Sequence, residues 1–194
     1  MGSNQSIVLN SETQEYTVDG IIYPRVTQIL PKQDFFCDSK TLEAVRQDGI
    51  RNHSLIESYH ETEDTHDIPY LEIYKRFLDE QEGLLGQFIC NEKSMFSRRG
   101  FVGTPDLIFS KARIDLKRSF GVKKYHALQL AGYNILAKDN GMIDTNRWFI
   151  LLINKEKNDY TLKPVYNPQA ETIFLALLQK HKISEAIDNY FTTL

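Results

Sequence analysis

The segment GTPDLIFSKARIDLKRS, residues 103–119, most constrains the fold because it places three charges within short apolar runs. Asp106 directly precedes an apolar tripeptide, and Asp115 and Lys117 alternate with apolar residues. An unpaired charge is costly to bury in a β-sheet. We therefore expect these side chains to pair with one another or to hold a metal ion.

The spacing of the three charges predicts a common site. Asp115 and Lys117 are two residues apart, so they project from the same face of a strand, whereas Leu116 faces the opposite layer. The eight residues between Asp106 and Asp115 allow a tight hairpin that brings the carboxylates together. Close carboxylates raise each other's pKa, and a hard cation such as Mg²⁺ or Mn²⁺ relieves the repulsion. Lys117 would then position a water or offset charge on a phosphate.

The spacing alone also permits a simpler interpretation. Asp115 and Lys117 would form an ion pair on an exposed strand, and Asp106 would be a turn residue. The two interpretations differ in whether Asp115 and Lys117 are exposed, as in a surface ion pair, or buried, as in a metal and phosphate site.

The whole chain of 194 residues is the size of a single domain, and its 41% hydrophobic content is ordinary for a globular protein. We expect no membrane partner, because no apolar run reaches the length of a membrane span, and no signal peptide at the N-terminus. Cys37 and Cys90 form no CxxC pair, which argues against a disulfide framework and a zinc ribbon and favours a reducing compartment such as the cytoplasm. Two unclustered cysteines also argue against an iron–sulfur cluster.

Charge is distributed unevenly along the chain. From Glu57 to Glu92 there are ten acidic residues against two basic ones, and from Lys93 to Lys124 there are nine basic residues against two acidic ones. This asymmetry favours a basic face that attracts a polyanion despite the net charge of −3. The alternative is that different elements simply carry different solvated charges.

Apolar periodicity and turn residues predict an α/β (α+β) fold with a mixed central sheet flanked by helices. Asp19-Gly20 indicates a type I′ turn, and Asn167-Pro168 indicates a helix start. The expected elements are a hairpin over 15–24, helices over 40–61, 70–83, 119–141 and 168–191, and strands over 86–96, 100–109, 113–118, 147–154 and 160–165.

Pro105-Asp106 followed by Asp115-Leu116-Lys117 resembles the core signature of the PD-(D/E)XK nuclease superfamily. Gly103-Thr104-Pro105-Asp106 resembles the GxxD motif of its RecB-like branch, and Lys117-Arg118-Ser119 resembles the DxKxS continuation. Gln129 and Tyr133 match the QxxxY helix motif of this branch. Farther upstream, Gly49, His53 and Glu57 resemble its G-x-x-x-H…E helix motif. The resemblance spans residues 23–191, after an N-terminal extension and hairpin start over 1–22. The size and layout are similar to phage recombination exonucleases and the mitochondrial genome-maintenance exonuclease.

This resemblance implies a restriction-endonuclease-like fold and a divalent-metal-dependent deoxyribonuclease, with an exonuclease of DNA recombination, repair or replication as the expected activity. It implies a Mg²⁺ or Mn²⁺ site formed by Asp106, Asp115, His53 and the carbonyl of Leu116, with Lys117 as the catalytic lysine. Supporting roles are expected for Glu57, Glu92, Gln129 and Tyr133, and DNA contacts for Lys93, Arg98, Arg99, Arg118, Ser119, Lys123 and Lys124.

The residues leave alternatives open. His53 and Glu57 would otherwise be a surface pair one helical turn apart, and Gln129 and Tyr133 would be packing residues. An endonuclease or a non-catalytic DNA- or protein-binding descendant would have the same fold. The expected partners are single- or double-stranded DNA ends and a single-strand annealing or replication protein, in a phage-encoded or bacterial cytoplasmic setting.

Overall fold

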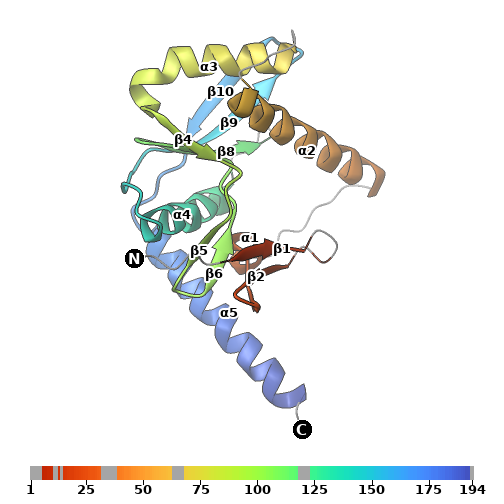
Figure 1. Ribbon diagram of the computed structural model, residues 1–194, viewed down its shortest axis with the longest axis vertical. Helices are drawn as coiled ribbons and strands as arrows, with labels where there is room; N and C mark the ends of the chain where they lie inside the picture. Colours follow the sequence, from red (N-terminus) through yellow and green to blue (C-terminus); the bar gives the residue numbers. More distant parts are fainter. Residues whose placement is uncertain are drawn as a thin grey trace.

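The computed structural model describes residues 6–10, 13, 15–31, 39–62, 68–117 and 123–192. These residues form a mixed α/β fold, which confirms the predicted fold class (Figure 1). In the described residues, no helix is sufficiently long and apolar to cross a bilayer. The helices are α1 (Val26–Ile29), α2 (Ser39–Thr62), α3 (Pro69–Leu85), α4 (Lys124–Asp139) and α5 (Ala170–Thr192).

A five-stranded sheet forms the centre of the fold, in the order β10-β9-β8-β7-β4. Neighbouring strands are antiparallel except β8 and β9, which are parallel and are connected by α4. A connection between parallel strands needs a crossover segment, which explains the helix between them. The strands of this sheet are β4 (Phe88–Asn91), β7 (Leu107–Phe109), β8 (Arg113–Lys117), β9 (Trp148–Asn154) and β10 (Asp159–Pro164).

Helices cover both faces of the sheet, and alternation along the strands assigns each side chain to a face. On β8, Ile114 and Leu116 pack in the apolar cluster that includes residues of α2 and α3. On β9, Ile150 and Leu152 pack in the other cluster, with α1, α4 and α5. Figure 1 shows α3 on one side of the sheet and α4 on the other. Asp115 alternates with Ile114 and Leu116 and therefore faces the α4 side.

The predicted N-terminal hairpin is confirmed. Asp19 and Gly20 have φ values of 51° and 82°, as a type I′ turn requires. The turn connects β2 (Tyr16–Val18) with β3 (Ile21–Tyr23), and β1 (Ile7–Leu9) completes a separate three-stranded sheet.

Two of the predicted strands are each divided in the structure. The predicted strand 86–96 becomes β4 and β5 (Met95–Ser97), with a break at Glu92, whose φ is 43°. The predicted strand 100–109 becomes β6 (Phe101–Gly103) and β7, because Pro105 has no backbone N–H for the sheet ladder. β5 and β6 pair with each other in a two-stranded sheet. Glu92 lies at the first break, and Asp106 directly follows Pro105 at the second. Both carboxylates face the candidate site.

The predicted helix ends are shifted by a few residues. The helix predicted over 70–83 extends to Leu85 and ends at Gly86, whose φ of 71° suits glycine. The helix predicted over 119–141 begins at Lys124, and residues 118–122 lie outside the described part of the chain. Asn167 accepts a hydrogen bond from the Gln169 backbone N–H, as expected of a residue at a helix start.

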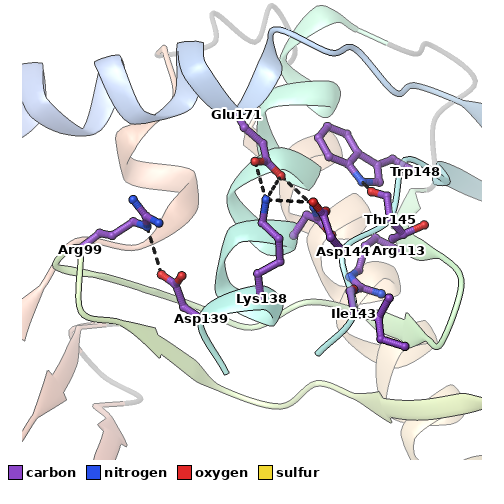
Figure 2. A network of polar contacts seen from close by, with 10 residues as sticks. Arg99, Arg113, Lys138, Asp139, Ile143, Asp144, Thr145, Trp148 and Glu171 are labelled. Atoms are coloured by element: carbon purple, nitrogen blue, oxygen red, sulfur yellow. Dashed lines mark hydrogen bonds and ion pairs between the residues drawn. The ribbon is translucent and has the colours of Figure 1, made fainter. Parts of the chain in front are cut away.

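A polar network joins the α4–β9 loop to α4 and α5 at the end of β8 that carries Arg113 (Figure 2). Lys138 on α4 forms ion pairs with Glu171 at 2.7 Å and with Asp144 at 3.5 Å. The buried guanidinium of Arg113 donates to the carbonyl of Ile143 at 2.5 Å. This network fixes the loop that leads into the central strand β9.

Candidate metal and phosphate site

Asp115 and Lys117 form an ion pair on β8, in which Asp115 is buried and Lys117 is half-buried. The Lys117 ammonium lies 2.7 Å from Asp115 Oδ2, and Gln129 Nε2 on α4 donates to Asp115 Oδ1 at 3.0 Å. Asp115 is 0% exposed, so the exposed-strand interpretation of this pair is wrong. Burial opposes the ammonium charge, but the charges of Asp115 and Asp106 outweigh it and raise the pKa of Lys117. Lys117 is therefore a cation at neutral pH.

Asp106 lies beside this pair because β7 and β8 are adjacent antiparallel strands, as predicted. Its Oδ2 accepts a hydrogen bond from the backbone N–H of Leu116 at 2.6 Å. Asp106 is 7% exposed. Burial and the charge of Asp115 raise the pKa of Asp106 well above its usual range. A cation bound between the two carboxylates would remove this cost.

The loop that leads to Asp106 is held on both sides. A Cβ atom on Gly103 would lie 2.9 Å from side-chain atoms of Leu136 and Val26, so only glycine allows this close approach. The Thr104 hydroxyl is hydrogen-bonded to the Tyr16 hydroxyl at 2.6 Å and to Ser94 at 3.1 Å. These contacts give Asp106 a fixed position.

His53 of α2 and Glu92, at the break after β4, complete the site. His53 Nδ1 lies 2.6 Å from Glu92 Oε1, and His53 Nε2 lies 3.8 Å from Asp106 Oδ2. An ionised carboxylate only accepts hydrogen bonds, so Nδ1 donates to Glu92 and the Nε2 atom faces Asp106. Burial lowers the pKa of His53, but the hydrogen bond to Glu92 and the charge of Asp106 outweigh burial and raise it to about 9.

His53, Glu92 and Asp106 fit a divalent cation, whereas Asp115, the other predicted aspartate ligand, lies outside this three-residue cluster. In the described part of the chain, ligand atoms of His53, Glu92 and Asp106 all lie within 4.8 Å of one another. Carboxylate ligands suit both Mg²⁺ and Mn²⁺. A carboxylate that accepts the second N–H of a ligand histidine is a common way to orient the ring. Glu92, which the sequence suggested only as a supporting residue, is thus in direct contact with the candidate ligand His53.

The other predicted supporting residues differ in their positions. Glu57 is exposed and borders a cavity of about 340 Å³ together with His53 and Glu92, but it is outside the three-residue cluster. Gln129 and Tyr133 are both buried, and Gln129 Nε2 also donates to the Tyr133 hydroxyl at 3.2 Å. Their positions favour alignment of Asp115 over direct contact with a ligand. The role of the Leu116 carbonyl stays a prediction.

The predicted basic residues that the structure describes are spread over different elements. Lys123 and Lys124 are exposed at the start of α4, close in sequence to Lys117, and Lys93 is exposed just after Glu92. Arg98 and Arg99 lie in the β5–β6 turn, where Arg99 Nε is 3.2 Å from Asp139 Oδ2. Arg118 and Ser119 lie outside the described residues.

Two features of the site were missed by sequence reasoning. Tyr70, at the start of α3, borders a small cavity of about 40 Å³ together with His53 and Lys117. Burial raises the pKa of Tyr70, and the negative charge of Asp106 raises it further. The β9–β10 turn, which carries the exposed Lys155 and Lys157, follows the end of β9 that pairs with Lys117. No local motif marks either feature, because both depend on the pairing of distant elements. Neither protein-family models nor curated proteins match this chain, so the site is interpreted from its own residues and geometry.

Proposed function

We propose that this chain is a divalent-metal-dependent deoxyribonuclease of the PD-(D/E)XK type, and that it acts as an exonuclease in DNA recombination, repair or replication. The observation that carries the proposal is the ion pair of Lys117 with the buried Asp115, beside Asp106 and the His53–Glu92 pair. Two buried carboxylates, Asp106 and Asp115, are costly in a purely structural role. Carboxylates next to an imidazole and an ammonium suit phosphodiester hydrolysis.

Each residue has a role in the proposed site. Asp106, Asp115 and His53 Nε2 hold Mg²⁺ or Mn²⁺, and Glu92 fixes the tautomer of His53. The bound cation supplies Lewis-acid stabilisation of the phosphate and lowers the pKa of a bound water. Lys117 places a positive charge at the reacting phosphate and orients the attacking water. Gln129 keeps the Asp115 carboxylate in place through its hydrogen bond.

The DNA backbone would approach the site from the end of β8. Lys123 and Lys124 follow that end in the chain, and the β9–β10 turn with Lys155 and Lys157 lies beside it. These four lysines would contact phosphates without sequence preference. Arg98 and Arg99 lie in a separate turn and would contact DNA only farther along the strand.

Glu92→Gln is expected to weaken Mn²⁺ binding by about 10- to 100-fold, because the ligand histidine loses its charged partner. The measurement is calorimetric titration of Mn²⁺ into the purified protein. Glu57→Gln is the matched control, since Glu57 borders the same cavity outside the cluster. Equal Mn²⁺ affinity of Glu92→Gln and the unmodified protein would remove Glu92 from the site.

The proposed activity is tested with end-labelled single- and double-stranded DNA in Mg²⁺, in Mn²⁺ and in EDTA. We expect cleavage with a divalent metal and none in EDTA. Degradation of linear DNA with preservation of covalently closed circles identifies an exonuclease, whereas cleavage of circles identifies an endonuclease. Binding of DNA without cleavage in either metal would support a non-catalytic binding protein instead.

A further inference from the structure

Tyr70 brings a buried hydroxyl group to the candidate site. It is the second residue of α3 and is 5% exposed. Its ring packs in the apolar cluster that also contains Ile56 of α2 and Leu116 of β8. Among the residues that the structure describes, none forms a hydrogen bond with the Tyr70 hydroxyl. A buried hydroxyl is unfavourable without such a partner, so this one is expected to bind a polar molecule in the cavity beside it.

The cavity beside Tyr70 has the size and the lining of a water site. Its volume is about 40 Å³, and it lies between α2, α3 and the ends of β8 and β9. A water molecule takes up about 30 Å³ in the liquid, so the cavity has room for one or two. Buried waters usually have two to four polar partners. The polar side chains that border this cavity are Asn52, His53, Tyr70 and Lys117.

These side chains have complementary hydrogen-bonding capacities. The Lys117 ammonium has three N–H donors and no acceptor, and its contact with Asp115 at 2.7 Å occupies one of them. Burial raises the pKa of Tyr70, so its hydroxyl stays neutral and can both donate and accept. The amide of Asn52 also has an acceptor oxygen. A water in the cavity can therefore accept a hydrogen bond from Lys117 and donate to the oxygen atoms of Tyr70 and Asn52.

We propose that this cavity holds the water that attacks the phosphate, and that Tyr70 and Asn52 position that water. This inference rests on the proposed nuclease function. The O–H bonds of the water point toward Tyr70 and Asn52, so its oxygen lone pairs face Lys117 and the phosphate. The oxygen forms a bond to phosphorus as the bond to the leaving oxygen breaks. One proton of the water ends on the leaving oxygen and the other on the phosphate product.

A crystal structure of the unmodified protein, without metal or DNA, tests the water site independently of cleavage. An ordered water is expected within about 2.6–3.2 Å of both the Tyr70 hydroxyl oxygen and Lys117 Nζ. In a crystal structure of the Tyr70→Phe variant, this water is expected to be lost or displaced, because one of its partners is removed. A cavity without ordered water in the unmodified protein, or the same water in the variant, would overturn the proposal.

Single-turnover cleavage of saturating end-labelled DNA in Mn²⁺ tests the role of this water. Tyr70→Phe keeps the buried ring and removes only the hydroxyl. The variant is expected to cleave roughly 10- to 100-fold more slowly, because a misplaced reacting group has an effect of this size. Its affinities for Mn²⁺, measured by calorimetry, and for DNA, measured by anisotropy, are expected to stay unchanged. An unchanged rate, or a matching loss of Mn²⁺ affinity, would overturn the role of Tyr70 in positioning water.

Tyr74→Phe is the matched control for Tyr70→Phe. Tyr74 lies one turn later on α3 and is 0% exposed, and its hydroxyl lies 2.7 Å from His60 Nε2, away from the residues that border the cavity. Tyr74→Phe is expected to lower the stability to urea but to keep the cleavage rate, and equal rate losses in the two variants would overturn the proposal. Absence of cleavage by the unmodified protein would overturn the proposed function and the catalytic role of the water, whereas a water lost only in Tyr70→Phe would still support the site.

Discussion

Lys117→Ala is expected to lower the rate of DNA cleavage by roughly 10²–10³-fold, the usual effect of removing one positioned electrostatic group. The ammonium of Lys117 is the charge that lies 2.7 Å from Asp115, where the reacting phosphate would bind. Binding of DNA should change far less, because one lost phosphate contact reduces the salt slope by about one unit. Single-turnover cleavage and fluorescence anisotropy of labelled DNA measure the two effects separately.

Lys124→Ala provides the matched control for Lys117→Ala. Lys124 is exposed at the start of α4. In the proposed complex it would contact only the phosphate backbone of the DNA. Its removal should change the rate by only a few fold and should weaken DNA binding most at low salt, with a salt slope reduced by about one unit. Both proteins are compared in saturating Mn²⁺, because the bound cation and Gln129 continue to stabilise Asp115. Normal cleavage by Lys117→Ala would make Lys117 only an ion-pair partner and would remove the most specific residue from the nuclease assignment.

Phe174→Ala is expected to lower the free energy of unfolding by about 3–5 kcal/mol, the usual cost of removing a buried aromatic side chain. Phe174 is 0% exposed and packs against Phe101 of β6, with ring centroids 5.2 Å apart. A Cβ on Gly132 of α4 would lie 2.8 Å from the Phe174 ring, so the surrounding helices are already in close contact and cannot collapse further. Urea unfolding of the metal-free protein measures the change.

The neighbouring Ile173→Ala substitution is the control for Phe174→Ala. Ile173 is on the same helix but is 41% exposed, so its truncation should cost less than about 1 kcal/mol. Equal losses for the two variants would mean that α5 is not anchored by Phe174. That result would contradict the packing of α5 on α4 described above.

Much of the fold could be predicted from local patterns. The Asp19-Gly20 pair specifies its turn by backbone conformation alone, and alternation around Asp115 specifies which face of β8 it uses. The candidate pairing of β7 with β8 also follows from local spacing, because a short hairpin leaves few registers. These are features in which residues close in sequence determine the structure.

The remaining features depend on contacts between distant segments. Glu92, at the break after β4, has a positive φ that the neighbouring sequence does not indicate. This conformation is stabilised by the contact of its side chain with His53 on α2. Tyr70 reaches the site only because α3 packs over the end of β8. The basic run from Lys93 to Lys124 was expected to form one face, but Arg113 within it is buried and donates to backbone carbonyls. A charge count along the chain cannot separate such a residue from surface lysines.

The most direct test of the proposed function compares the unmodified protein with Asp115→Asn, purified in parallel, on the same end-labelled DNA in Mn²⁺. The substitution keeps the size of the buried side chain but removes the charge that would hold the cation. We predict metal-dependent cleavage by the unmodified protein and a loss of at least about 10²-fold in the variant. Absence of cleavage by the unmodified protein in both Mg²⁺ and Mn²⁺, or equal cleavage by the two proteins, would contradict the assignment of this site as a nuclease centre.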